Sequence, residues 1–152
     1  MEAIHNYQVA EIEVIYRPKF KASERPKIST GKEAANIFLD TWNPDTLELY
    51  EEFKVMILSR NNKVLGIFTA SKGGIFSTTV DITFILGVAL KAKASNLILC
   101  HNHPSGNLKP SETDSATTAK FLAASKILGL GCLDHIILTA DGYFSFADNG
   151  LM

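Results

Sequence analysis

The chain has 152 residues, of which 46% are hydrophobic and 20% are charged, and its formal net charge at pH 7 is −1. This composition is typical of a soluble globular protein with one well-formed core, and the near-neutral charge excludes a global electrostatic attraction to nucleic acid or to an anionic membrane. Two cysteines in apolar surroundings, no secretory leader and no apolar span of about 18 residues predict a cytoplasmic protein without membrane association.

The first third of the chain predicts a strand, a basic connector and a helix. Apolar and polar residues alternate over Tyr7 to Tyr16, as in a half-buried strand. The connector, Arg17 to Lys27, is rich in lysine and arginine with aromatic residues between them. Such a cluster can contact nucleic acid, but a solvated connector containing two prolines explains it better. Thr30 and Glu33 have the spacing of a capping box, which predicts a helix that ends at Asn43.

The middle of the chain predicts a hairpin and a second helix. The hairpin strands are Glu51 to Leu58 and Val64 to Phe68, joined by a polar turn. A Gly/Ser/Thr-rich connection follows over Thr69 to Thr79, and its last residue or Asp81 caps a helix that extends to about Ala94. Strands flanked by helices predict an α/β sandwich with a mixed sheet. The remaining elements expected are a helix over Ser111–Leu128 and strands over Leu133–Thr139 and Tyr143–Phe146.

The most informative stretch is a His-X-His pair between a short strand and a helix. Leu97 to Cys100 is an apolar run typical of a buried strand, and Ser111 precedes a long run of helix formers. Side chains two residues apart in an extended segment share a face, so His101 and His103 can point at one object. Asp114, in the first turn of the helix, can fold back toward them. Two imidazoles and a carboxylate are the ligands of a catalytic zinc site, which keeps a fourth position for water.

Each part of this pattern also has a structural explanation. Ser111 and Asp114 have the spacing of a capping box, which needs no metal. Cys100 adjoins His101, but strand alternation turns its thiol to the opposite face. His135 is another candidate ligand, and a hydrogen-bonded structural role explains it better.

The whole constellation resembles a known motif. The spacing His-X-His, seven residues, Ser, two residues, Asp matches the motif of the JAMM (MPN-type) metalloproteases at every position. The resemblance covers about residues 47–152. Residues 1–46 are similar only to N-terminal extensions of some short RadC-like proteins. The flanking segments most similar to the bacterial RadC branch are His101-Asn102-His103-Pro104-Ser105-Gly106, Pro110-Ser111 and Asp134-His135-Ile136-Ile137.

The resemblance implies a three-layer α-β-α sandwich of the cytidine-deaminase-like (JAMM/MPN) type. Residues 47–152 would form a JAMM/RadC-like metal-binding domain, with the strand, connector and helix of residues 1–46 packed on it or extending it. One zinc ion would be held by His101, His103 and Asp114. Deaminase chemistry itself is disfavoured, because no Pro-Cys-X-X-Cys ligand pair follows the histidines.

The resemblance also implies a catalytic role for two further residues. A metal-activated water needs a base, and the residues alone leave Glu51 and Glu52 as equal candidates. The Glu-X-Phe pattern of the RadC branch maps the base onto Glu51, since Phe53 follows two residues later. Ser111 would donate a hydrogen bond to the developing oxyanion or to the water. The implied activity is that of a zinc-dependent metallopeptidase or isopeptidase acting on a peptide or an isopeptide-linked protein.

Two other functions remain open at this stage. The RadC branch carries a historical DNA-repair label, so the chain could be a nucleic-acid-binding module, although its one basic cluster lies in the N-terminal connector. It could also be a metal-binding scaffold without turnover, against which an intact Glu51 argues. The sequence names neither the substrate nor the oligomeric state.

Overall fold

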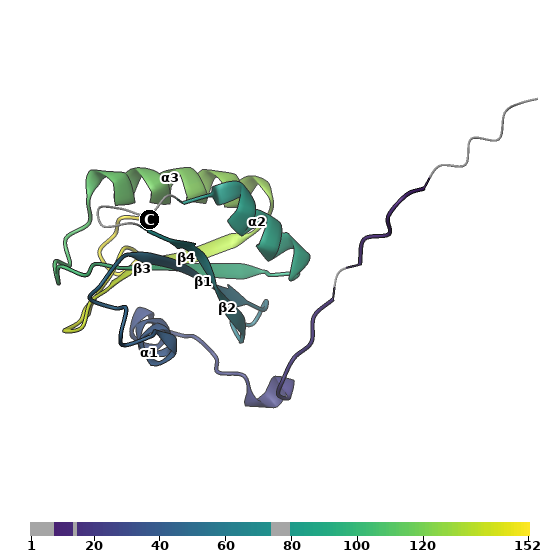
Figure 1. Ribbon diagram of the computed structural model, residues 1–152, viewed down its shortest axis with the longest axis horizontal. Helices are drawn as coiled ribbons and strands as arrows, with labels where there is room; N and C mark the ends of the chain where they lie inside the picture. The colour runs from purple at the N-terminus through teal and green to yellow at the C-terminus, as the bar shows by residue number, and fades with distance from the viewer. Residues whose placement is uncertain (1–7, 14, 74–79) are drawn as a thin grey trace, which may run out of the picture.

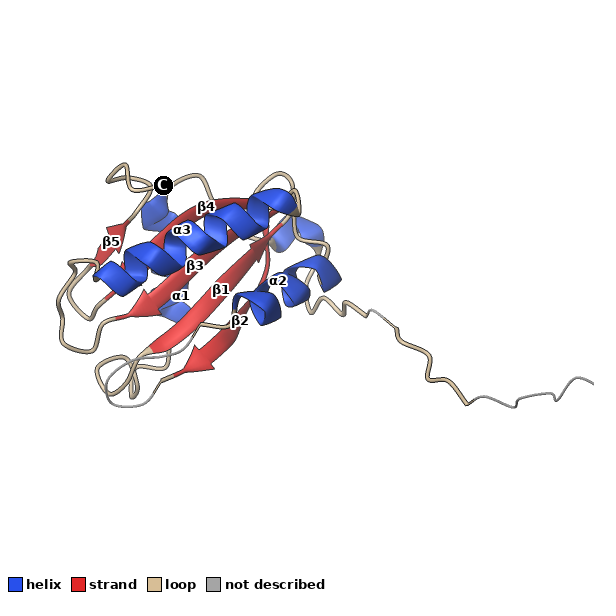
Figure 2. Ribbon diagram, turned by 90° about the horizontal axis from the view of Figure 1, so that it is seen from above, coloured by secondary structure: helices blue, strands red, loops and turns tan. Residues whose placement is uncertain are grey.

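The computed structural model describes residues 8–13, 15–73 and 80–152. These residues form a three-layer sandwich in which helices cover both faces of a mixed sheet (Figures 1 and 2), which confirms the predicted α/β class. The elements in chain order are a short 3-10 helix (Ala22–Glu24), α1 (Gly31–Thr41), β1 (Glu52–Leu58), β2 (Val64–Lys72), α2 (Ile82–Lys91), β3 (Asn96–Asn102), α3 (Glu112–Ile127), β4 (Gly131–Leu138) and β5 (Tyr143–Ser145).

The sheet places the ends of its central strands side by side. Its strand order is β2-β1-β3-β4-β5, with β3 and β4 parallel and the other neighbouring pairs antiparallel. The start of β1 therefore lies next to the end of β3, where Phe53 pairs with His101. The end of β4 lies on the other side of β3, where Ile137 pairs with His101. Residues from three strands thus converge on one edge of the sheet.

The helix α1 covers one face of the sheet. The Thr30 hydroxyl accepts a hydrogen bond from the Glu33 nitrogen at 3.2 Å, and the Glu33 carboxylate accepts one from the Thr30 nitrogen at 3.1 Å. This confirms the predicted capping box. The helix and the sheet share one buried cluster, whose helical members are Ala34, Ala35 and Phe38 and whose strand members include Met56, Leu58, Ile98, Cys100, Ile136 and Leu138.

The helices α2 and α3 cover the opposite face (Figure 2). The second cluster lies between them and the sheet, and its strand members alternate with those of the first. Because both faces are covered, the central strands are apolar along nearly their whole length. Asp81 caps α2 by accepting a hydrogen bond from the Phe84 nitrogen at 3.0 Å, and the helix ends at Lys91 rather than near Ala94. Thr79, the alternative cap, lies outside the described residues.

The predicted N-terminal strand and the predicted end of the hairpin differ from the structure. Over Gln8–Glu13 and Ile15–Tyr16 no strand forms, and Val9 is 87% exposed. Alternation produces a strand only where a neighbour supplies hydrogen bonds and covers the apolar face; here the chain leads away from the sheet (Figure 1). Tyr7 and Val14 lie outside the described residues. The predicted connection after Phe68 is also shorter, because β2 continues to Lys72 by pairing with β1, and residues 74–79 lie outside the described residues.

Among the described residues, no helix combines the length and the apolar character that a membrane crossing requires.

Candidate metal centre

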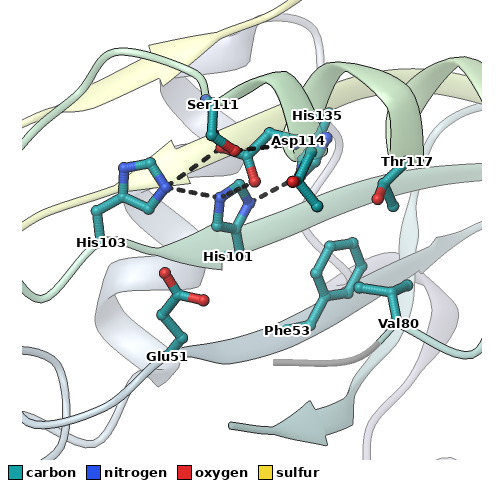
Figure 3. A pocket seen from close by; sticks show the side chains of 10 residues that line it. Glu51, Phe53, Val80, His101, His103, Ser111, Asp114, Thr117 and His135 are labelled. Atoms are coloured by element: carbon teal, nitrogen blue, oxygen red, sulfur yellow. Dashed lines mark hydrogen bonds and ion pairs between the residues drawn. The ribbon is translucent and has the colours of Figure 1, made fainter. Parts of the chain in front are cut away.

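The two histidines lie where β3 ends and the loop to α3 begins. His101 is the sixth residue of β3 and is 3% exposed, and His103 follows the strand and donates its backbone N–H to the Leu138 carbonyl at 2.9 Å. Both imidazoles point to the side of the sheet that α3 covers, and Asp114 reaches them from the first turn of that helix (Figure 3). The structure therefore brings together the three residues that the spacing predicts.

The three donor groups have the separations that one small ion requires. The Nε2 atoms of His101 and His103 are 3.0 Å apart. One carboxylate oxygen of Asp114 lies 3.2 Å from His101 Nε2 and the other lies 3.5 Å from His103 Nε2. Bonds of about 2.0–2.1 Å in a tetrahedral site place neighbouring ligand atoms about 3.3 Å apart. Among the described residues, His101, His103 and Asp114 form the group that could hold a metal ion.

Asp114 serves the helix cap and faces the histidines at the same time. The Ser111 hydroxyl accepts a hydrogen bond from the Asp114 nitrogen at 3.0 Å, and one carboxylate oxygen accepts from the Ser111 nitrogen at 2.7 Å. The other oxygen is the one nearest to His101. The capping box and the ligand interpretation are thus compatible, because the cap holds the carboxylate in the rotamer that reaches the imidazoles. The loop returns through Gly106, whose φ of 80° is in the left-handed region that favours glycine.

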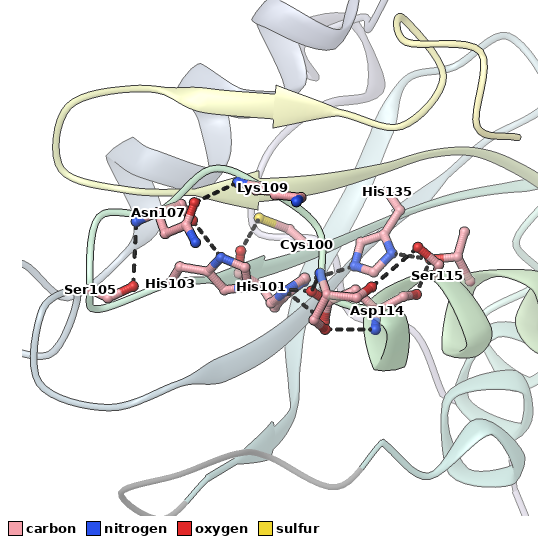
Figure 4. Close-up of polar contacts among 11 residues, drawn as sticks. Cys100, His101, His103, Ser105, Asn107, Lys109, Asp114, Ser115 and His135 are labelled. Atoms are coloured by element: carbon pink, nitrogen blue, oxygen red, sulfur yellow. Dashed lines mark hydrogen bonds and ion pairs between the residues drawn. The ribbon is translucent and has the colours of Figure 1, made fainter.

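Hydrogen bonds behind the imidazoles orient both rings (Figure 4). His103 Nδ1 lies 2.5 Å from the Asn107 carbonyl oxygen, which can only accept, so this nitrogen carries a proton and Nε2 is the nitrogen left to bind an ion. His101 Nδ1 lies 2.9 Å from His135 Nε2. His135 Nδ1 in turn lies 2.6 Å from the Thr118 hydroxyl oxygen. His135 therefore lies behind His101 and outside the donor group.

The charges of the cluster suit a cation. Burial alone would raise the pKa of Asp114, but hydrogen bonds from His101 and His103 hold it far below its usual range. The hydrogen bond to Asp114 raises the pKa of His103 above its ordinary value, although burial opposes it. Burial, together with the neighbouring His101, lowers the pKa of His135 well below its ordinary value. The centre thus combines a permanent negative charge with imidazoles, and a bound cation would replace the proton that they share.

The structure separates the two glutamates that the residues alone left equivalent. Glu51 lines a cavity of about 330 Å³ together with His101, His103 and Asp114, and Figure 3 shows its carboxylate on the same side as the imidazoles. Glu52 faces the opposite side of the sheet and is 2% exposed. It accepts a hydrogen bond from the Thr46 hydroxyl at 2.8 Å and lies 3.8 Å from the Lys54 ammonium. Strand alternation therefore leaves Glu51 alone of the two beside the candidate metal position.

Asn102 has a role that the sequence analysis missed. Its side-chain oxygen accepts a hydrogen bond from the Glu52 nitrogen at 2.7 Å, and its amide donates to the carbonyls of Leu47 and Tyr50 at 2.7 and 2.9 Å. The residue is fully buried. It thereby holds the segment that carries Glu51. The available signal was a polar residue on the buried face of an apolar strand, which needs hydrogen-bond partners there.

The remaining candidate ligand, Cys100, lies on the other face of the sheet, in the cluster beneath α1. Its side chain is fully buried, and burial raises the pKa of its thiol well above the ordinary value. Strand alternation thus keeps it out of the donor group, as expected.

Residues 28–151 match the family described as the RadC-like JAB domain. A UPF0758 protein of Flavobacterium johnsoniae is 44% identical over 126 residues, which cover 82% of this chain and 53% of that protein. A UPF0758 protein of Porphyromonas gingivalis is 42% identical over 103 residues, covering 67% of this chain and 45% of that protein. A third, from Clostridium acetobutylicum, is 36% identical over 134 residues, covering 88% and 57%. The chain spans about half the length of these relatives.

Proposed function

The chain belongs to the RadC-like JAB domain family, and from this membership and the geometry of its centre we propose that it is a zinc-dependent hydrolase of amide bonds. Its substrate would be a peptide or an isopeptide-linked protein. The observation that carries the proposal is the convergence of His101, His103 and Asp114 beside the carboxylate of Glu51 in one cavity.

The donor set supports zinc. His101 and His103 would contribute imidazole nitrogens and Asp114 a carboxylate oxygen. Magnesium and calcium prefer sites made of oxygen ligands, whereas imidazole suits zinc and related transition metals. When bound, zinc lowers the pKa of a coordinated water to about 7 and polarises a carbonyl oxygen.

Glu51 would act as the general base and then as the general acid. Its carboxylate accepts the proton of the attacking water and delivers that proton to the nitrogen of the leaving amine. Its place in the same cavity as the three ligand residues supports this role, because a base must lie within hydrogen-bond reach of the proton that it takes.

Ser111 would stabilise the oxyanion that develops on the substrate carbonyl. Its oxygen accepts the Asp114 N–H in the helix cap, so the hydroxyl keeps its own proton for donation. The capping role therefore does not compete with a catalytic one. Ser111 lines the cavity that contains Glu51 and His101.

The surface around the centre suits an extended chain. A second depression of about 410 Å³ adjoins the first and shares Glu51, His103 and Ser111 with it. The first is lined in part by Phe53 and Val80, and the second in part by Asn107 and Lys109. We place the scissile bond where the two meet, with residues 47–152 carrying the chemistry and residues 1–46 extending that domain.

Metal analysis and turnover test the proposal together. We expect about one zinc ion per wild-type chain and its loss in His103→Ala. Glu51→Gln should retain the zinc and lose turnover of peptide and isopeptide libraries by roughly 10²–10⁴-fold.

Glu52→Gln is the matched control, because it removes the adjacent carboxylate on the other face, and it should retain turnover. Zinc content unaffected by His103→Ala would refute the site, and lost turnover in Glu52→Gln with normal turnover in Glu51→Gln would refute the assignment of the base.

A further inference from the structure

We propose that Thr118 and His135 are positioning residues that hold a proton on His101 Nδ1, so that Nε2 is the nitrogen through which His101 can bind the ion. The inference rests on the metal centre proposed above, but it concerns two residues outside the donor group. The observation behind it is a continuous chain of contacts from the Asp114 carbonyl through Thr118 and His135 to His101.

The donor and acceptor in each of these hydrogen bonds follow from the first contact, between Thr118 and the Asp114 carbonyl. The Thr118 hydroxyl oxygen lies 2.7 Å from the backbone carbonyl oxygen of Asp114, four residues earlier in α3. A carbonyl oxygen can only accept, so the single hydroxyl proton of Thr118 is donated there. The hydroxyl oxygen also lies 2.6 Å from His135 Nδ1 and must accept at this contact. His135 therefore carries a proton on Nδ1.

The protonation of His135 on Nδ1 in turn determines which nitrogen of His101 carries a proton. The His135 ring is 1% exposed, is stacked on Phe146 with ring centroids 4.8 Å apart and also contacts Phe53. Neither of the polar contacts described for this ring is a carboxylate, and its burial disfavours an imidazolium. A neutral ring with its proton on Nδ1 has a lone pair on Nε2. His101 Nδ1, at 2.9 Å, donates to that lone pair.

The tautomer of His101 determines which of its nitrogens can bind an ion at the candidate metal position. With a proton held on Nδ1, His101 can bind an ion only through Nε2, the atom that lies 3.2 Å from the Asp114 carboxylate. The opposite polarity would place a proton on this nitrogen and block it as a ligand. His103 reaches the same state through the Asn107 carbonyl. Because this series of hydrogen bonds starts at the backbone carbonyl of Asp114, the helical turn that presents the Asp114 carboxylate also orients the buried imidazole of His101.

The test uses variants of Thr118, because they leave both histidines in the chain. Two-bond ¹H–¹⁵N spectra of labelled protein report which ring nitrogens carry protons, and competition with a chromogenic chelator gives the zinc Kd. We expect His135 Nδ1–H in the metal-free wild type and His101 Nδ1–H in the zinc-loaded protein. Thr118→Val keeps the shape of the side chain but removes the hydroxyl, so it should lose the single His135 tautomer and weaken zinc binding roughly tenfold. Thr118→Ser restores the hydroxyl and should restore both properties.

A variant of His135 provides an independent check. In His135→Gln the amide oxygen can still accept from His101 Nδ1–H, so this variant should bind zinc more tightly than His135→Leu, which cannot accept. A His135 ring protonated on Nε2 in the wild type would overturn the inference, as would an unchanged zinc Kd in Thr118→Val. Failure of the wild type to bind zinc would instead refute the proposed function, while the tautomer in the metal-free protein would still decide the inference.

Discussion

The side-chain oxygen of Asn102 lies 2.7 Å from the backbone nitrogen of Glu52, so the residue between the two histidines holds the segment that carries Glu51. The pleat of β3 sends the imidazole of His101 to one face and the amide of Asn102 to the other. One short segment therefore places two candidate ligands directly and the candidate base through a hydrogen bond across the sheet.

This relationship predicts the effect of Asn102→Asp. The new side chain has the same size and can accept from the Glu52 nitrogen, but it cannot donate to the carbonyls of Leu47 and Tyr50. We expect a loss of about 1–3 kcal/mol in the free energy of unfolding and reduced turnover at normal zinc content. Urea denaturation and metal analysis measure both. Asn61→Asp, at an exposed position of the β1–β2 turn, is the control and should change little; full turnover in Asn102→Asp would show that this residue does not position Glu51.

Ser111 allows capping and catalysis to be measured separately. Glycine is a tolerable N-cap that costs only a few tenths of a kcal/mol relative to serine, whereas alanine costs about 1 kcal/mol. Ser111→Gly should therefore fold with nearly normal stability and still lose turnover by roughly 10²–10³-fold, since it lacks the hydroxyl donor. Ser111→Ala should lose both stability and turnover. Thermal denaturation and kinetic assays distinguish these outcomes, and normal turnover in Ser111→Gly would limit the residue to the helix cap.

Zinc affinity should depend on pH through His103. Zinc binds a neutral imidazole, and the hydrogen bond to Asp114 raises the pKa of His103 above 6.5, so below that raised pKa the ion must displace a proton. We expect the zinc Kd to rise about tenfold per pH unit of acidification there and to be flat at higher pH. Asp114 stays ionised throughout, because its pKa lies far below its usual range. Chelator competition between pH 5.5 and about 9 measures the slope; a Kd independent of pH would contradict the assignment of His103 as a ligand.

The metal-free protein should show the opposite trend. A histidine whose folded pKa is raised adds stability that is fully present below its unfolded pKa and is lost as pH rises through the folded value. Chelator-treated wild type should therefore lose stability as pH rises above about 6.5, and His103→Gln should lack this component. His135 affects stability in a separate, lower pH range, because its folded pKa is depressed. The unfolded chain gains a proton at His135 before the folded protein does, so the free energy of unfolding falls as pH decreases below about 6.5. Urea denaturation across both windows separates the two histidines.

The thiols should be inert in the folded protein. Burial raises the pKa of Cys132 to about 12 and that of Cys100 well above its ordinary value, and the thiolate is the reactive form. A thiol reagent at about pH 8 should label neither residue in the native state and both in urea. Labelling should be the same with and without zinc. Rapid native labelling of Cys100 that zinc suppresses would place this thiol at the metal centre.

Local signals in the sequence were sufficient for most of the elements and for the candidate ligand group. The alternation of β3 puts His101 and His103 on one side, and the Ser111–Asp114 capping box holds the carboxylate at the start of α3. These relationships span only a few residues. They hold wherever the strand and the helix form.

Longer-range relationships required the tertiary structure. The alternating segment before Arg17 has the pattern of a strand, yet among the described residues no strand pairs with its backbone. The strand β2 extends beyond its predicted end because β1 continues beside it. The residues alone could not choose between Glu51 and Glu52, because alternation separates two faces but does not say which face carries the site.

The sequence by itself determined which residues could bind a metal, because their spacing within one strand, one loop and one helical turn dictates their directions. Only the tertiary structure decided what surrounds them. Asn102 meets Glu52 and His135 meets His101 across separations of 50 and 34 residues, and such contacts depend on strand order and register. The physical reason is that a side chain's direction is a local property of the backbone, whereas its neighbour is a property of the packed sheet.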